Sequence, residues 1–390
     1  MEVLGFDKLT DSNNSCGISY FELFQDEKPI YNCHLSTLSS SKSRSYYTYL
    51  NYQEKFKTGE RFHKLYIDNG NDLDFYSKSP NDGVLSITGE TEIKAIFKDP
   101  YDNSTELTFK TKDAIPSVQP VFNRVGIEVI DNTLIFTAAK PTPANEVPVT
   151  YFIKGEKFNT LPYQEKSNLA TYLIDLRKGL IDSILFQNKT FFTGLTATIP
   201  SSQSYSYYSQ HMNLRFEKDD LFDTLFLKST YTVGSKNEEI FEIGRPSEPL
   251  KKSIQVELFP HQKYEGDGWS VYSRDDNGNL YYVGGKWELN KLKFSTSFFG
   301  KYTIAKDSTP PKITPITLSN SRVSFRITDN LSGINDIQLT VNGQWILMYH
   351  DAKTSRIWSV LPPEIKTLKG ELVLIVTDNE NNTQTYKTTL

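Results

Sequence analysis

Short runs in which hydrophobic and polar residues alternate recur along the whole chain, separated by turn residues. The clearest lie near the C-terminal end, where Asp, Asn or Gly bounds each run. Alternation with a period of two residues indicates half-buried β-strands. The strands that we expect here are 323–327, 337–341, 345–349 and 372–376. Strands at this spacing over roughly eighty residues predict an immunoglobulin-like sandwich.

Turn residues mark the borders of this last domain. Residues 306–311 end in two prolines, which cannot bond in a sheet ladder and therefore predict an extended linker. Asn342-Gly343 predicts a two-residue hairpin turn, because both positions tolerate positive φ. The domain is predicted to span residues 307–390.

The N-terminal end repeats this pattern. Residues 16–23 align with 332–339, and 99–105 align with 378–383. Such an internal repeat indicates a multidomain β array. In the same alignment residues 2–6 fall on 323–327, the second strand of the sandwich, so the first domain has no first strand of its own in this chain. Two explanations stay open: a segment upstream has been removed, or the sandwich lacks that strand.

The whole chain is therefore predicted to be all-β, with about four tandem immunoglobulin- or fibronectin-like sandwiches. The first spans 1–113 and carries a helical insertion at 49–62, broken at Gly59. The second spans 114–195 and opens at Ile115-Pro116 and Pro120. Its strands are expected at 127–130, 134–137, 173–176 and 183–187. The third, a β-sandwich, spans 196–306.

Composition agrees with this fold class and excludes several functions. The chain has 23 Tyr and 24 Phe but few alanines, which favours strands over helices. Its net charge of −4, without a basic run, argues against nucleic-acid binding. No apolar stretch approaches the roughly 18 to 20 residues of a membrane span. Residues 1–7 lack the basic and apolar regions of a signal peptide.

Motifs for catalysis are absent from the sequence. The five histidines form no H-E-x-x-H or H-x-H arrangement, as a catalytic zinc site would need. No G-x-S-x-G elbow, Gly-rich phosphate loop or C-x-x-C occurs either. We therefore predict that the chain is not an enzyme. We expect all five histidines on the surface or at strand edges: His34, His63, His211, His261 and His350.

A hydrolase assembled across domains is the remaining catalytic alternative. It would need titratable groups that converge in a cleft. The first candidates are Asp219, Asp220, Asp223 and His211. The simpler interpretation of the acidic cluster at 219–223 is a solvated loop before a strand, and Glu238-Glu239 is likewise expected in an exposed turn.

The two cysteines are expected to be free. A hairpin that turns at Asp26-Glu27 pairs Cys33 with Tyr20 and leaves Cys16 about four residues, or roughly 13 Å, away. A disulfide needs Cα atoms within about 7 Å.

Three aspartates give the one candidate metal site. In a sandwich, the entry linker, the loop after the second strand and the last hairpin turn lie at one pole. In the last domain these positions hold Asp307, Asp329-Asn330 and Asp378-Asn379. Calcium prefers several oxygen ligands of this kind, and a calcium ion there would stiffen the linker. The alternative is that Asp and Asn serve their turns through bonds to the backbone.

Two tyrosine clusters, 46–49 and 205–208, are candidates for a glycan or protein contact surface. Tyrosine offers apolar area with a polar tip, as interfaces require. Alternation along a strand, however, predicts that about half of each cluster points into a core.

The arrangement resembles the C-terminal region of Gram-negative envelope proteins that carry a lysostaphin-type (LytM-like) zinc peptidase domain. In those proteins several immunoglobulin-like domains follow the peptidase. The segments that carry the resemblance span nearly the whole chain: residues 17–23, 51–62, 175–180, 221–225, 299–302, 307–311 and 343–348.

The catalytic motifs of that family, H-x-x-x-D and H-x-H, are absent here, so no catalytic residue or zinc ligand is carried over. The resemblance implies a non-catalytic scaffold or protein-recognition region of a peptidase-like protein, exported to the periplasm or cell surface. The partner is expected to be an envelope protein, or a glycan such as peptidoglycan. The alternative is a free-standing adhesin or glycan-binding array, which an exposed, coplanar row of Tyr and Trp would favour.

Overall fold

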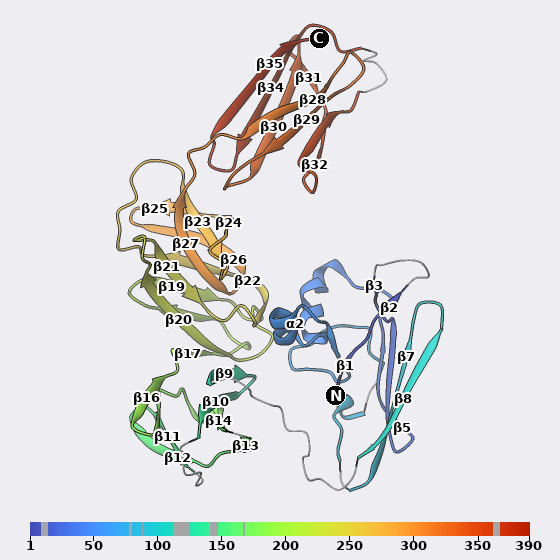
Figure 1. The fold of residues 1–390 in the computed structure, drawn as a ribbon, viewed down its shortest axis with the longest axis vertical. Helices are drawn as coiled ribbons and strands as arrows, with labels where there is room; N and C mark the ends of the chain where they lie inside the picture. Colours follow the sequence, from blue (N-terminus) through green and yellow to red (C-terminus); the bar gives the residue numbers. More distant parts are fainter. Residues whose placement is uncertain are drawn as a thin grey trace.

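The computed structural model shows an all-β chain of tandem antiparallel sandwiches (Figure 1). It describes residues 1–8, 15–77, 80–87, 89–111, 125–140, 147–166, 168–361 and 367–390. Its buried hydrophobic residues form four clusters that follow one another along the sequence. Ile115, Pro116 and Pro120, where we expected the second domain to open, lie outside the described residues.

The C-terminal sandwich packs two four-stranded sheets, with strand orders β28-β29-β33-β32 and β31-β30-β34-β35. Asn342 and Gly343 both have positive φ, at 49° and 76°, which confirms the predicted hairpin turn. The expected strand at 345–349 is instead two strands, which belong to opposite sheets and meet at Leu347. The strands are β28 (Lys312–Leu318), β29 (Val323–Thr328), β30 (Ile334–Val341), β31 (Gln344–Ile346), β32 (Met348–Asp351), β33 (Arg356–Ser359), β34 (Glu371–Asp378) and β35 (Thr383–Thr389).

The N-terminal sandwich shares this plan. Its main sheet has the order β5-β4-β7-β8, which matches β31-β30-β34-β35, and β1 pairs with β6 as β29 pairs with β33. Among the described residues no strand occupies the place of β28. The strands are β1 (Glu2–Leu4), β2 (Asp7–Lys8), β3 (Ser15–Cys16), β4 (Tyr20–Gln25), β5 (Lys28–His34), β6 (Phe62–Lys64), β7 (Thr91–Lys98) and β8 (Ser104–Thr111).

Both cysteines are free, as predicted, but the register differs by one residue. Cys33 pairs with Phe21 rather than with Tyr20, because a bulge between Leu23 and Phe24 shifts the ladder. Cys33 is buried, and burial raises the pKa of its thiol to about 12.

The predicted insertion is helical, but it begins and ends earlier than the expected range of 49–62. It consists of η1 (Ser40–Ser45), α1 (Tyr46–Tyr49) and α2 (Tyr52–Thr58), and a second short 3₁₀ segment, η2 (Pro80–Gly83), follows later. Asn51 caps α2 by accepting a hydrogen bond from the backbone N–H of Glu54. Gly59 ends the helix with a φ of 80°, as expected of a left-handed cap.

The second sandwich pairs sheets of order β13-β14-β10-β9 and β12-β11-β15-β16. Phe226, which belongs to the third domain, packs into the hydrophobic cluster of this one, so the joint between the two domains is apolar. The elements are β9 (Gly126–Ile130), β10 (Thr133–Ala139), β11 (Val149–Ile153), β12 (Glu156–Thr160), β13 (Gln164–Lys166), β14 (Leu169–Asp175), η3 (Leu176–Lys178), β15 (Ser183–Phe186) and β16 (Lys189–Phe192).

The third sandwich is larger than an immunoglobulin domain, with a six-stranded sheet of order β17-β20-β21-β27-β23-β24 and a five-stranded sheet of order β18-β19-β22-β26-β25. The strands are β17 (Leu195–Ile199), β18 (Tyr205–Tyr208), β19 (Met212–Phe216), β20 (Leu225–Val233), β21 (Glu239–Ile243), β22 (Pro249–Leu258), β23 (Trp269–Arg274), β24 (Leu280–Gly284), β25 (Lys286–Glu288), β26 (Lys291–Phe298) and β27 (Gly300–Lys306).

None of the helices in the described part of the chain is long and apolar enough to cross a membrane.

Candidate functional site

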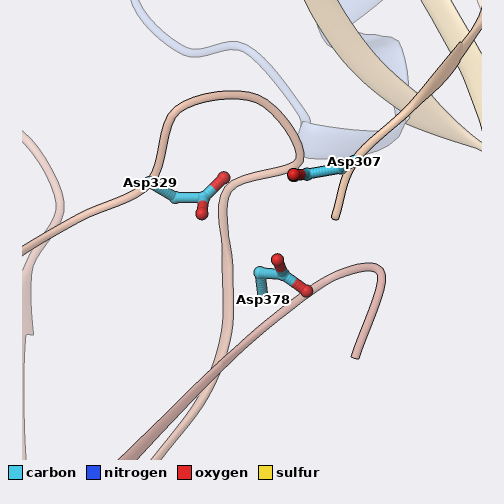
Figure 2. A group of neighbouring side chains, drawn as sticks. All are labelled: Asp307, Asp329 and Asp378. Atoms are coloured by element: carbon cyan, nitrogen blue, oxygen red, sulfur yellow. The ribbon is translucent and has the colours of Figure 1, made fainter. Parts of the chain in front are cut away.

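The three aspartates proposed from the sequence meet at the junction of the third and fourth domains. Asp307 follows β27, Asp329 follows β29 and Asp378 ends β34. One carboxylate oxygen of each lies within 4.8 Å of the others. Figure 2 shows the three carboxyl groups turned toward one shared space from three separate segments. Asp307 and Asp378 are almost completely buried.

Backbone N–H groups hold each carboxylate in place. Asp307 accepts from Ser332, at 2.8 Å, and Asp329 accepts from Gly333, also at 2.8 Å. Asp378 accepts from the backbone and the side-chain amide of Asn382, both at 2.8 Å. Asp307 also accepts from the backbone N–H of Thr309, at 3.1 Å, so the turn chemistry that we considered as the alternative is present at all three residues.

Two features of the triad go beyond turn chemistry. The Oδ1 atom of Asp329 is buried without a hydrogen-bond partner. Among the ion pairs of the described residues, none joins a Lys or Arg to any of the three aspartates. Carboxylates packed this closely repel one another unless a cation lies between them. An oxygen-only ligand set suits calcium rather than zinc.

Several contacts fix the triad between two domains. The backbone N–H of Asp307 donates to the carbonyl of Gly268, at 2.9 Å, and Ser270 donates to Glu380 in the β34–β35 turn. The side-chain amide of Asn382 also donates to the carbonyl of Asp307, at 3.2 Å. A cation at the triad would therefore bind residues that already connect the third domain to the fourth.

A second candidate site is a cleft of about 260 Å³ that the first three domains line together. Sequence analysis did not find it, because its residues come from segments far apart in the chain. Glu2 accepts hydrogen bonds from Asn51, at 2.8 Å, and from Tyr66, at 3.1 Å. The carboxylates that line the cleft are those of Glu2, Glu54, Asp68, Asp131, Asp223 and Glu248.

Asp131 is a lining carboxylate of the cleft whose pKa is raised. It lies in the turn between β9 and β10 and is exposed. Desolvation by the surrounding protein raises its pKa, and the Asp68 carboxylate raises it further, although Lys64 opposes the shift. A carboxyl group with a raised pKa close to others is typical of functional sites.

Aromatic side chains form one wall of the cleft. The rings of Tyr47 and Tyr52 lie 4.8 Å apart at 54° to one another. Lys55 lies over Tyr47, 5.3 Å from the ring centroid. Phe222 lines the cleft from the third domain. The cleft thus combines aromatic surface with oxygen acceptors.

Polar contacts hold the walls of the cleft together. Arg44 donates to the carbonyls of Leu250, at 2.8 Å, and of Ser297, and Lys251 pairs with Asp72 at 2.8 Å. These bonds join the first domain to the third domain, and Figure 1 shows α2 lying against it. In addition, α2 contacts the second domain, because Lys57 pairs with Glu128.

Gly70 of the first domain lies directly against the backbone of Phe222 in the third domain. Its φ is 69°, and a Cβ atom would lie 2.0 Å from the carbonyl oxygen of Phe222. We expect Gly70→Ala to force the two domains apart and to increase the radius of gyration measured by small-angle X-ray scattering. Gly59→Ala is the matched control, because Gly59 has a similar φ of 80° but no atom near its Cβ position. Equal scattering curves for the two variants would contradict this interface.

Of the four residues named for a hydrolase, the structure places only Asp223 in the cleft. Asp220 is buried, not in a solvated loop, and accepts a hydrogen bond from the backbone of Glu217 at 2.7 Å. His211 stacks on Tyr231, with centroids 3.7 Å apart. Asp219 lies in the turn between β19 and β20, with a φ of 67°.

Two other expectations about polar residues are wrong. Glu239 is completely buried. Its carboxylate accepts hydrogen bonds from Tyr231, Tyr264 and the backbone of His261, which compensate for the loss of water. His63 is also buried, beside Phe21 and Tyr49. Glu239, Phe241 and Ile243 are spaced two residues apart on β21, so their side chains lie on the same face of the strand. This spacing was the signal in the sequence that places Glu239 inward.

The tyrosine clusters divide between core and surface. Tyr49 is completely buried in the first domain, while Tyr47 lines the cleft. Tyr205 and Tyr207 pack against the core of the third domain, whereas Tyr208 is 72% exposed.

Fold and sites together define a multidomain array of antiparallel β-sandwiches. Residues 196–307 match the model of the Zu5-like domain. No curated protein matches the chain. One similar solved structure comes from work on host cell surface retention of a 1.5-MDa bacterial ice-binding adhesin. It shares 9% identity over 96% of this chain and 86% of that chain, with a TM-score of 0.15, and a similarity this weak carries no argument.

Proposed function

We propose that this chain is a non-catalytic binding array of the bacterial cell surface or envelope, and that its ligand is a neutral oligosaccharide bound in the interdomain cleft. The observation that supports this function is the composition of the cleft walls. Tyr47 and Tyr52 line the cleft with aromatic surface that the apolar side of a sugar ring can contact. The carboxylates around them accept hydrogen bonds from hydroxyl groups, and the amides can accept or donate them.

Charge favours a neutral ligand over an anionic one. Six carboxylates line the cleft against two lysines, Lys57 and Lys64, and both lysines already pair with carboxylates. An anionic glycan would be repelled by this excess of acidic groups. Location in the envelope is supported by the resemblance to peptidase-associated regions, and association with a peptidase stays a prediction from that resemblance.

Binding of chitotetraose, a neutral oligosaccharide, tests the proposal by isothermal titration calorimetry. We expect saturable binding to the 390-residue chain, weakened about tenfold by Tyr47→Ala because aromatic surface that lines the cleft is lost. Tyr208→Ala removes an exposed tyrosine outside the cleft and should leave the affinity unchanged. An anionic muropeptide should bind more weakly than chitotetraose. Absence of binding, or equal loss in both variants, would contradict this function.

A hydrolase is the second candidate, because Asp131 and Asp223 line the same cleft and the pKa of Asp131 is raised by desolvation. A carboxylic acid beside a second carboxylate is the arrangement that glycosidases use. Product chromatography after incubation with chitotetraose separates the two candidates. Shorter products that disappear in Asp131→Asn would replace binding with hydrolysis as the function.

Calcium is the proposed cofactor, bound by Asp307, Asp329 and Asp378. Its role is to neutralise the three carboxylates and to stiffen the junction in which they lie. This role is structural, and it is separate from ligand binding in the cleft.

A further inference from the structure

A groove in the first domain lies where the fourth domain has a strand. In the fourth domain, β28 pairs with β29 along one sheet and lies beside β35 of the other sheet. In the first domain the equivalents of β29 and β35 are β1 and β8. Among the described residues, β1 pairs only with β6 and β8 only with β7. Both strands therefore present an unpaired backbone edge.

The space between these two edges is a cavity of about 290 Å³. Residues 3–7 line one side, and Phe97, Thr105 and Leu107 are among those that line the other. Its lining includes charges of both signs, on Asp7, Lys98 and Asp99. The cavity thus runs beside the end of β1, and backbone edges and apolar side chains form its walls.

In the described part of the chain, the core-facing side of β8 is only partly covered. Leu107 pairs with Ala95 and Phe109 with Ile93, both buried, so all four side chains are on the core side of the sheet. Leu107 and Phe109 are nevertheless 48% and 43% exposed. On β1 and just after it, Leu4 and Phe6 are 44% and 60% exposed. Together they form an apolar surface around the groove.

The fourth domain shows how such a surface is covered. There Tyr386 of β35 pairs with Leu374 and packs edge-to-face on Phe325, with centroids 5.4 Å apart. Ile313 of β28 is partly buried against the same core. One extended strand with an apolar residue facing the core is thus the occupant that completes this sandwich.

We propose that the groove binds an extended segment of a partner protein, which adds as a strand antiparallel to β1 and covers the apolar side chains of β8. Main-chain hydrogen bonds along β1 provide part of the affinity, and alternate apolar side chains of the segment provide selectivity. The partner segment is uncharged at its core-facing positions, because the inner wall of the groove is apolar. This inference does not depend on oligosaccharide binding in the interdomain cleft, since the groove is a separate cavity lined by other residues.

A labelled peptide with the sequence of residues 310–320, which includes β28, is the probe, and fluorescence anisotropy with the whole chain measures its binding. We expect saturable binding and slower hydrogen exchange in residues 2–6 and 104–109. Leu107→Arg should weaken binding about tenfold or more, because it introduces a charge into the apolar wall. Thr108→Arg is the matched control: it changes the next residue of β8, on the outer face of the sheet.

A second variant keeps the test independent of folding defects. In this variant, the sequence of residues 310–322 is fused directly before Glu2, so that the chain supplies its own strand to the groove. The fused strand should abolish binding of the free peptide and raise the melting temperature of the first domain. The proposal is overturned if the peptide does not bind, if Leu107→Arg and Thr108→Arg act equally, or if the grafted chain still binds. A dimer that protects β8 without peptide would also overturn it, because the occupant would then be a second copy.

Discussion

Millimolar calcium should raise the melting temperature of the fourth domain by about 10 to 20 °C, and Asp378→Asn should abolish this rise. A ligand at about 100 times its Kd stabilises the native state by about 2.7 kcal/mol. In a domain of this size each kcal/mol shifts the melting temperature by roughly 4 to 8 °C. Differential scanning calorimetry with EDTA or calcium measures the effect.

The substitution also separates the two interpretations of the triad. The asparagine introduced at position 378 can still accept the backbone hydrogen bonds of the turn, but it loses the bond from the side-chain amide of Asn382. Without calcium, the removal of one of three neighbouring negative charges should offset this loss, so Asp378→Asn should be about as stable as the natural chain.

Asp275 provides a matched control for this experiment. It accepts from the backbone and the side-chain amide of Asn279, both at 2.8 Å, which are the same bonds that Asp378 makes with Asn382. It is not part of the triad. Asp275→Asn should therefore keep the full calcium response. A natural chain that does not respond to calcium would leave the aspartates with their turn roles only.

Acid should destabilise the first domain through His63. Burial among aromatic rings lowers the pKa of His63 from 6.5 to about 4, and the nearby Arg61 charge lowers it slightly further, while a backbone hydrogen bond with Gly5 opposes the shift. The folded state therefore binds this proton less readily than the unfolded chain. The stability that neutral His63 contributes is fully present above pH 6.5 and is lost as the pH falls toward 4, by about 3 kcal/mol in total.

Urea unfolding followed between pH 7 and pH 4 measures this loss. In His63→Phe the part of the slope that belongs to this residue should disappear, because the ring cannot take up a proton. The exposed His34 is the control, and His34→Gln should retain the natural pH dependence. The same slope in His63→Phe as in the natural chain would assign the acid sensitivity to other groups.

Local patterns in the sequence predict most strands and the aspartate triad. Alternation and turn residues define β29 and β34, and the geometry of a sandwich then places the loops that follow them at one pole, which is why Asp329 and Asp378 meet Asp307. The cleft has no such local signal. Its carboxylates, such as Glu2 and Asp223, meet because separate domains dock, and docking depends on contacts such as that of Arg44 with the third domain, which no periodicity encodes.

Buried polar residues mark a second limit of sequence analysis. Glu239 and His63 were expected on the surface because of their residue types, but each lies inside a sandwich. For Glu239 the sequence did hold a signal, because it is spaced two and four residues from Phe241 and Ile243 and therefore lies on the same, inward face of its strand. For His63 the three-residue strand β6 is too short to define a phase.

The bonds between Arg44 and the third domain have a mechanical consequence. The first and third domains hold each other directly, although the second domain lies between them in sequence. A pulling force on the two ends of the chain therefore does not load the domains one after another. It acts first on the Arg44 and Lys251 contacts, which shield the second domain from tension until they rupture.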